Sequence, residues 1–252
     1  MWSLDAVAAV PSWRLLNEPS GARLGFSTRS GGVSDGPYAT LNLGASTGDR
    51  PEAVAENRRR LLESLELRPA RVVTAGQVHG TAVALMTEPG LVRNHDGLVT
   101  RVPGLALAVS SADCLPILFT APGTVAAAHA GWRGVVAGIA EATLVALCQT
   151  AHTASAGVHV HLGPCIRECC YVVGPEVAAL FPHEARREFE GRTYVSLPTA
   201  VSLRLRSAGV PAEAIADVGA CTSCEATRYF SHRRDRGLTG RHWGVAAVRE
   251  DV

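Results

Sequence analysis

The chain has 252 residues, of which 47% are hydrophobic and 19% charged, and its formal net charge is +1. This length favours one large domain over two, so we predict a single catalytic domain over residues 1–252. The balanced charge gives no global attraction to polyanions, and we therefore expect no nucleic-acid partner.

Nothing in the sequence indicates export or a membrane span. The segment that begins at Met1 carries neither the basic start nor the long apolar run of a secretory signal. Asp113, His129 and Arg133 interrupt the most apolar region, so no stretch reaches the roughly 20 residues that a membrane helix needs. We expect a cytoplasmic protein with no membrane partner. Its seven cysteines are then thiols, metal ligands or packing residues rather than disulfides.

Taken in chain order, the first half of the sequence predicts short strands. Residues 25–49 are rich in Gly, Ser, Thr and Asn, which predicts an ordered loop around a short strand. After this loop, β-type runs are broken by turn signals. They predict strands over residues 72–74, 81–85, 97–99, 105–109, 115–119 and 124–128.

The second half predicts helices mixed with strands. Residues 134–150 are apolar all round, which indicates a helix buried on most of its surface, and a strand follows over residues 158–162. This order favours a parallel crossover with the chemistry beyond the carboxyl end of the first strand. Further helices are predicted over residues 175–180, 184–189 and 198–208, and strands over 214–218 and 243–248. The fold class is α/β, of α+β type, with a mixed sheet.

Three polar residues stand where a predicted strand gives way to a turn. They are His79 in Gln-Val-His-Gly, Cys114 in Ala-Asp-Cys-Leu-Pro and His129 in Ala-His-Ala-Gly-Trp-Arg-Gly. Two imidazoles and one thiolate suit zinc, and three protein ligands leave a fourth position open, as in catalytic sites. Each residue alone could equally be a buried thiol or a hydrogen-bonded core histidine. Asp113, beside the cysteine, could orient a histidine, accept a proton or cap a turn.

The remaining cysteines carry a weaker signal. Cys221-Thr-Ser-Cys224 has the spacing of a zinc knuckle or a redox pair, and Cys165, Cys169 and Cys170 could supply further thiolates. No second Cys-x-x-Cys is present, so packing is the favoured interpretation and the role of these residues is left open.

Arginines recur beside polar turns and are candidates for binding phosphate. We assign that role first to Arg29, with help from Arg233 or Arg234, and include Asn42 and Arg133 as further candidates. A solvated charge or an arginine that closes a loop is the alternative for each of the arginines.

Nine segments, in order along nearly the whole chain, carry a resemblance to a known family. They are Phe26-Ser-Thr-Arg-Ser-Gly-Gly-Val-Ser, Leu41-Asn-Leu-Gly, Gln77-Val-His-Gly, Asp96-Gly-Leu-Val-Thr, Ala112-Asp-Cys-Leu-Pro, Ala128-His-Ala-Gly-Trp-Arg-Gly, Leu162-Gly-Pro-Cys-Ile, Tyr229-Phe-Ser-His-Arg-Arg-Asp and Thr239-Gly-Arg. With them the chain resembles the YfiH-like, or laccase-domain, proteins. Members of that family have been called multicopper polyphenol oxidases and, in some bacteria, peptidoglycan editing factors.

The resemblance implies both a fold and an activity. The fold would be a single layered α/β/β/α domain with mixed sheets, and zinc would be bound by His79, Cys114 and His129. The activity would be that of a purine nucleoside phosphorylase acting on adenosine, inosine and S-methyl-5'-thioadenosine, with adenosine deamination as a second activity. The expected small-molecule partners are therefore a purine nucleoside and phosphate. The family often has a His after Leu-Asn-Leu-Gly and a Glu in Tyr-Glu-Val-Gly, where this chain has Ala45 and Val172.

Three other functions remain open. Cys114 and His129 could form a metal-free thiolate and base in a hydrolase, or in an enzyme that edits peptidoglycan precursors. Copper-dependent oxidation of polyphenols is disfavoured, because 2 Met and the one His-x-His pair, His159 and His161, are too few to build several copper sites. The pocket could also belong to a non-catalytic nucleotide-binding module.

Overall fold

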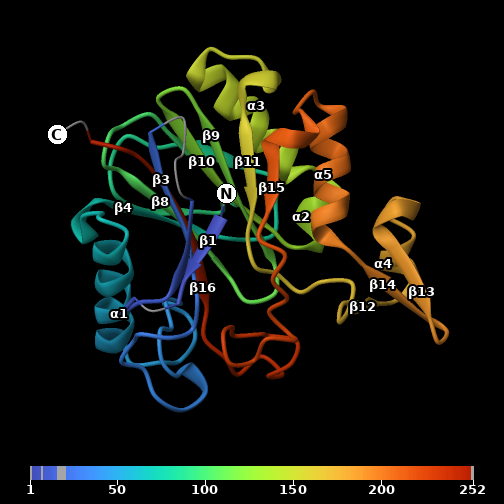
Figure 1. Ribbon diagram of the computed structural model, residues 1–252, viewed down its shortest axis with the longest axis horizontal. Helices are drawn as coiled ribbons and strands as arrows, with labels where there is room; N and C mark the ends of the chain where they lie inside the picture. Colours follow the sequence, from blue (N-terminus) through green and yellow to red (C-terminus); the bar gives the residue numbers. More distant parts are fainter. Residues whose placement is uncertain (1, 7, 16–20, 251–252) are drawn as a thin grey trace.

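Two β-sheets packed face to face, with helices on both outer sides, form the body of the computed structural model (Figure 1). The structure describes residues 2–6, 8–15 and 21–250, so the two ends of the predicted 1–252 domain lie outside the described residues. The layered α/β/β/α arrangement with mixed sheets that the family resemblance implies is confirmed.

The first sheet has seven strands, and chain segments far apart in sequence meet at its centre. Its strand order is β1(Trp2–Asp5), β2(Ser12–Leu15), β3(Ala22–Ser27), β16(His242–Val248), β8(Ala106–Ser111), β4(Val72–Gly76) and β6(Gly90–Arg93). β16 is antiparallel to both β3 and β8, whereas β4 is parallel to β8 and β6.

The second sheet has six strands and carries the predicted crossover. Its order is β15(Ile215–Asp217), β11(His159–Leu162), β9(Leu115–Ala121), β10(Thr124–Ala130), β7(Gly97–Thr100) and β5(Val83–Leu85). β10 and β11 are both antiparallel to β9, so they run parallel to each other with β9 between them. The predicted parallel crossover is therefore confirmed.

Alternation along the strands separates the core into layers, because successive side chains of a strand point to opposite faces. On β9, Leu118 packs between the sheets, whereas Ile117 and Phe119 face the helices on the other side. On β8, Leu107 packs between the sheets and Ala108 faces the first sheet's helix layer. Both faces of each central strand are therefore buried.

Helices cover the outer faces of the two sheets (Figure 1). α1(Pro51–Ser64) buries Leu61 and Leu62 in the same cluster as residues of β8 and β16. α2(Trp132–Ala137), α3(Ile139–Ala151) and α5(Leu197–Ser207) contribute to the cluster that covers the second sheet. The single helix predicted over residues 134–150 is wrong: Gly138, with φ of 97° in the left-handed region, ends α2 and begins α3.

A small third sheet includes one segment that the sequence predicts as a helix. Its order is β12(Val172–Val173), β14(Arg192–Val195) and β13(Arg186–Phe189), and α4(Pro175–Ala178) lies next to it. The helix predicted over residues 184–189 is therefore wrong. Glu190 and Gly191 both have positive φ and close a two-residue hairpin, whose pairing outweighs local helix propensity.

Several elements are absent from the sequence predictions. They are β1, β2, β6, α1 and the small-sheet strands β12 and β14. The strands among them are short, and α1 is mostly polar. Short 3-10 helices join the larger elements at Gly36–Tyr38, Pro69–Arg71, Ser155–Gly157, His183–Ala185 and Ala212–Ala214.

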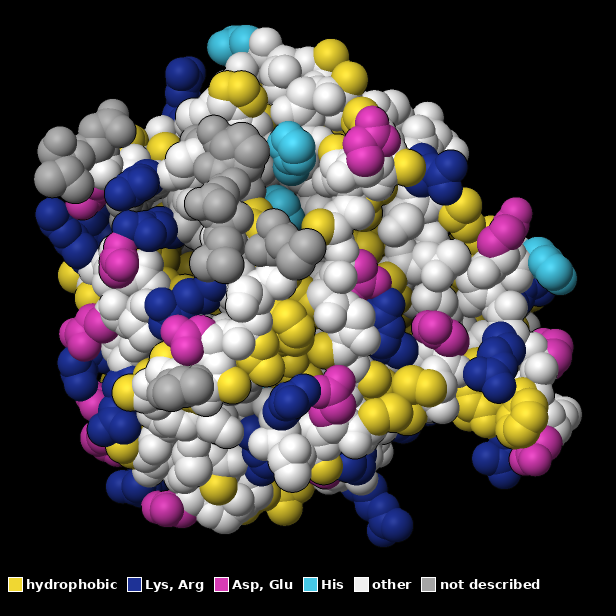
Figure 2. All heavy atoms as spheres, viewed as in Figure 1, with side chains coloured by type: hydrophobic (Ala, Val, Ile, Leu, Met, Phe, Trp, Pro, Cys, Tyr) yellow, Lys and Arg dark blue, Asp and Glu magenta, His cyan; other side chains and the backbone are white. Residues whose placement is uncertain are grey.

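No helix among the described residues has the length and apolar character required to cross a membrane. The face in Figure 2 shows acidic and basic side chains interspersed, as the balanced charge leads one to expect.

A buried histidine at the start of β16 makes the stability of the fold depend on pH. His242 is 4% exposed, and its Nε2 accepts a hydrogen bond from the Phe230 amide at 2.7 Å, so that nitrogen carries no proton. Burial, together with the positive charges of Arg29 and Arg241, lowers the pKa of His242 to about 3. In the unfolded chain the pKa would be about 6.5.

Since the unfolded state binds the proton more readily, the free energy of unfolding should fall as pH drops from about 6.5 toward 3. The contribution of His242 is on the order of 1.4 kcal/mol per pH unit within that window. Urea unfolding at several pH values should give a steeper loss for the native sequence than for His242→Gln, whose amide oxygen can accept the same N–H but does not titrate. Parallel stability curves for the two proteins would contradict this assignment.

Candidate metal centre

The three predicted ligands meet beside the second sheet. His79 lies in the loop between β4 and β5, Cys114 immediately precedes β9, and His129 lies near the end of β10. One ligand atom from each lies within 4.8 Å of the other two, and Cys114 Sγ is 3.8 Å from His79 Nε2. The imidazole rings of His79 and His129 are edge to face, with centroids 4.8 Å apart.

A buried carboxylate that the sequence interpretation missed organises this centre. Asp96 is fully buried, and its Oδ1 lies 2.8 Å from His129 Nδ1. The same carboxylate accepts hydrogen bonds from the backbone amides of Val78, His79 and Gly80 at 2.8–3.0 Å. It therefore fixes one histidine through its ring and the other through its loop. Because Nδ1 of His129 is engaged, Nε2 is the nitrogen left for a metal.

Backbone geometry around the ligands is unusual. His79 and Asp113 both have positive φ, 61° and 92°, although neither is glycine. At Gly131 an added Cβ would lie 2.5 Å from His79 Cδ2 and 3.1 Å from Cys114 Sγ, so glycine is what lets this backbone pass so close. Strained backbone of this kind persists where the surrounding structure enforces it, often at functional sites.

The thiol and the buried imidazole shift each other's ionisation. Burial by itself would raise the pKa of Cys114, but the charge of His129 and hydrogen bonds to both histidines lower it to about 6. Burial would lower the pKa of His129, whereas the Cys114 thiolate and Asp96 raise it to about 9. Near neutral pH the metal-free centre is thus a thiolate beside an imidazolium. A thiolate is the form of cysteine that binds zinc.

Asp113 does not orient a histidine. Its Oδ1 accepts a hydrogen bond from Thr222 Oγ1 and its Oδ2 accepts one from the Arg233 amide, both at 2.6 Å. The carboxylate that contacts a histidine is Asp96. Asp113 instead joins the segment just before β9, which carries Cys114, to two loops from the C-terminal part of the chain.

A cavity of about 860 Å³ opens beside the three ligands. This volume lies within the range of sites for small organic ligands. Aromatic rings on its wall come from Trp132, Tyr171 and Trp243, and its polar groups include Gln77 and Ser110. The cavity also contacts Ala45, where the family often has a histidine.

Of the predicted phosphate-binding residues, two line this cavity. The Arg133 guanidinium lies over the Trp132 ring, with Cζ 4.3 Å from the ring centroid. The Arg233 guanidinium lies 5.2 Å from the centroid of Tyr171 and donates to the Val172 carbonyl at 2.9 Å. Arg241, which the sequence interpretation missed, also lines the cavity, and burial lowers its pKa.

The other three predicted phosphate ligands lie outside the cavity lining. Arg29 donates to the Ala39 and Ala226 carbonyls and stacks on Phe230. Asn42 is fully buried, and its side-chain amide donates to Thr47 and accepts from the Gly44 amide within the same loop. Arg234 pairs with Asp235 and donates to backbone carbonyls. Glycine beside an arginine indicated proximity to a turn but not the direction of the guanidinium.

Both sequence and fold match known proteins. The model of the family described as "Multi-copper polyphenol oxidoreductase laccase" matches residues 23–249. The chain is 41% identical over 253 residues to the purine nucleoside phosphorylase YlmD of Geobacillus stearothermophilus, with 92% of each chain covered. It is also 41% identical over 240 residues to the purine nucleoside phosphorylase YfiH of Escherichia coli, which covers 92% of this chain and 95% of that relative.

Solved structures give the same result. The crystal structure of YlmD from Geobacillus stearothermophilus matches with a TM-score of 0.89 at 40% identity, covering 95% of this chain and 96% of that one. The hypothetical protein YfiH of Bacillus licheniformis matches with a TM-score of 0.91 at 31% identity, covering 98% and 99%.

Replacing the organising carboxylate should weaken metal binding. In Asp96→Asn an amide N–H₂ would face N–H donors that the carboxylate now accepts, and removal of a carboxylate behind a metal-binding histidine typically costs 10–100-fold in affinity. We expect that loss for zinc, measured by competition with a chromogenic chelator. Asp35→Asn, at an exposed ion pair with Arg50, is the control and should bind zinc as the native protein does. Equal zinc affinity in Asp96→Asn would contradict the organising role.

Proposed function

We propose that this chain, which belongs to the multi-copper polyphenol oxidoreductase laccase family, is a zinc-dependent purine nucleoside phosphorylase. The observation that carries this proposal is the open His79, Cys114 and His129 set at a cavity lined by arginines and aromatic rings. Relatives at 41% identity bear the same activity in their names. Adenosine, inosine and S-methyl-5'-thioadenosine are the substrates we propose.

Zinc suits the donor set, because two imidazoles and one thiolate leave one tetrahedral position open. When bound, the metal would supply a Lewis acid that stabilises developing negative charge. Asp96 would hold the ring of His129 and the loop of His79 in place through the contacts described above. Copper, the metal in the family's description, is the alternative that metal quantification distinguishes.

Phosphorolysis exchanges one bond at the sugar for another. A phosphate oxygen bonds to C1′ as the bond from C1′ to the purine nitrogen breaks, and the base leaves with that electron pair. Arg133, Arg233 and Arg241 would hold the phosphate, while Trp132 and Tyr171 would contact the base. Asp113 would act by position, because it holds the Arg233 backbone beside the cysteine ligand. Adenosine deamination at the same centre is the second activity that we propose.

One observation favours a second candidate, a metal-free thiol hydrolase. The paired shifts of Cys114, with a pKa of about 6, and His129, with a pKa of about 9, produce the thiolate that such an enzyme needs. Peptidoglycan-precursor editing would be one reaction of this type. Activity that survives complete removal of metal would favour this candidate over the zinc enzyme.

Product analysis tests the proposed function. Metal-quantified protein incubated with adenosine and phosphate should release adenine and ribose 1-phosphate, and omission of phosphate should abolish both. Cys114→Ala should lose turnover together with the zinc ion of this centre, because the Cys114 thiolate is one of its proposed ligands. Cys148→Ala, on α3 and outside the cavity lining, should retain both.

Other products separate the alternatives. Inosine alone would replace phosphorolysis with deamination as the main activity. Adenosine binding without any product would leave a nucleotide-binding module and overturn both activities.

Phosphate recognition gives an independent prediction. Arg233→Met should raise the KM for phosphate about tenfold to hundredfold, since a charged hydrogen bond contributes roughly 1.5–3 kcal/mol. The KM for adenosine and the zinc content should change little. Arg236→Met, an exposed neighbour outside the cavity lining, should leave the KM for phosphate unchanged. An unchanged KM in Arg233→Met would remove Arg233 from the phosphate site.

A further inference from the structure

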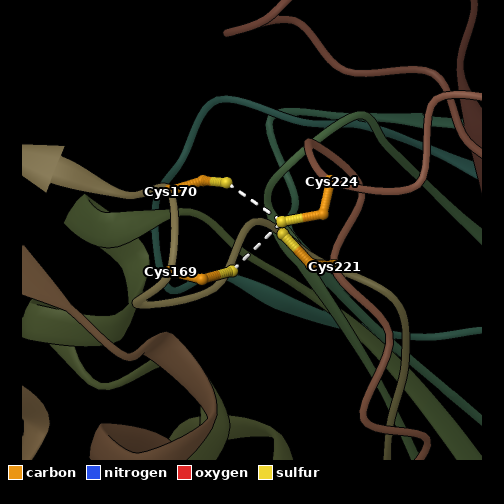
Figure 3. Close-up of side chains that lie close together, drawn as sticks. All are labelled: Cys169, Cys170, Cys221 and Cys224. Carbon is orange, nitrogen blue, oxygen red and sulfur yellow. Dashed lines mark hydrogen bonds between the residues drawn. The ribbon is translucent and has the colours of Figure 1, made fainter.

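Four cysteines outside the proposed catalytic centre converge on one point. Cys169 and Cys170 come from the segment between β11 and β12, and Cys221 and Cys224 from the segment between β15 and β16. Figure 3 shows the four sulfur atoms turned toward one another from these two segments. All four lie within 4.8 Å of one another, with Cys224 Sγ 3.4 Å from Cys169 Sγ and 3.2 Å from Cys170 Sγ.

The sequence showed one Cys-x-x-Cys pair, Cys221 and Cys224, and the fold brings a second pair of thiols beside it. A tetrahedral zinc site of Cys₄ type needs a second pair of thiolates, and the adjacent Cys169 and Cys170 provide it. With zinc–sulfur bonds of about 2.3 Å, the sulfurs of a regular tetrahedron are about 3.8 Å apart. The observed separations of 3.2 Å, 3.4 Å and at most 4.8 Å bracket that value.

Backbone pairing already aligns the two segments beside the sulfurs. Cys165 N–H donates to the Ala220 carbonyl, and Thr222 N–H donates to the Cys165 carbonyl, so a short parallel bridge joins Cys165 to Cys221. Backbone amides of Cys224 and Arg167 donate toward Cys221 Sγ. Such donors stabilise a thiolate. The side chain of Arg167, two residues before Cys169, forms an ion pair with Asp217.

Cys169 and Cys224 ionise less readily than a free cysteine when the four sulfurs share only protons. Burial and hydrogen bonds to the neighbouring sulfurs raise the pKa of Cys169 above its ordinary value. A hydrogen bond with Cys170, followed by burial, raises the pKa of Cys224 to about 11. A divalent cation reverses this balance, because it stabilises several thiolates at once.

We propose that Cys169, Cys170, Cys221 and Cys224 bind a second zinc ion, separate from the centre at His79, Cys114 and His129. Four protein ligands leave no open position, so this site is structural rather than catalytic. Each bound thiol releases one proton as its sulfur–zinc bond forms, and no electron is transferred.

The two segments that carry the four cysteines also contribute to the wall of the cavity or contact residues that line it. Ile166 and Tyr171, which flank the first cysteine pair in sequence, line the cavity. Thr222, between the second pair, donates to Asp113 next to the ligand Cys114. A zinc ion shared by the two segments would therefore fix Tyr171 and Asp113 relative to each other, with no direct part in the reaction.

Metal counting after dialysis against a weak chelator tests the proposal. Native protein should hold two zinc ions per chain, Cys114→Ala one, Cys224→Ser one, and the double variant none. Cys148→Ser, outside both groups, should keep two. Cys224→Ser should also melt at a lower temperature than Cys148→Ser.

Cobalt binding to Cys114→Ala provides a readout that leaves the four-cysteine cluster intact and does not depend on enzyme activity. It should give the intense visible bands of tetrahedral cobalt bound by four sulfurs. Absence of those bands, iron in place of zinc, or an unreduced intact mass showing disulfides among the four cysteines would each overturn the assignment. Failure of the proposed phosphorylase activity would not affect any of these results.

Discussion

The hydrogen bonds of one buried carboxylate hold the candidate centre together. Asp96 immediately precedes β7, and the antiparallel pairing of β7 with β10 places it opposite His129. From there it contacts the His129 ring and three successive amides of the loop that carries His79. A carboxylate so buried is stable only because donors surround it. Burial by itself would raise the pKa of Asp96, but the hydrogen bonds with His129 and with the amides of Gly80 and Val78 lower it. The sheet register thus determines where two of the three ligands lie.

The cavity depends on contacts between distant parts of the chain. Asp113 connects the start of β9 to the loops around Thr222 and Arg233, and Arg233 reaches the Val172 carbonyl beside the small sheet. The four-cysteine cluster brings two of these segments together again, next to the backbone bridge between Cys165 and Cys221. Rigid sheets therefore position the candidate metal ligands, whereas long loops held by polar contacts shape the wall of the cavity. Such a division lets the cavity vary while the ligand geometry is preserved.

Sequence patterns were most informative where a residue type has few uses. Ordered motifs indicated the family and grouped His79, Cys114 and His129. Strand periodicity located the second sheet and the central strands of the first, but not β1, β2 and β6. The role of Asp96 was not predicted, because Asp-Gly before a strand is typical of an ordinary turn and its partner His129 is distant in sequence. Arg29, which the sequence predicts as a phosphate ligand, donates to two backbone carbonyls, because a guanidinium beside glycine can satisfy carbonyls as readily as it binds an anion. Residues 184–189 have the composition of a helix, yet the turn at Glu190 and Gly191 imposes a hairpin. Each of these outcomes depends on tertiary contacts that local sequence does not contain.

Anomalous scattering from crystals of the native protein tests the central claim most directly. Data collected just above and just below the zinc absorption edge should give a difference peak bounded by His79 Nε2, Cys114 Sγ and the free nitrogen of His129. That peak should vanish below the edge, and Asp96 should contact His129 on the side away from it. Two results would contradict a zinc centre. One is an anomalous peak at this position that follows the copper edge, and the other is no anomalous peak on either side of the zinc edge, with Cys114 in contact only with a histidine ring.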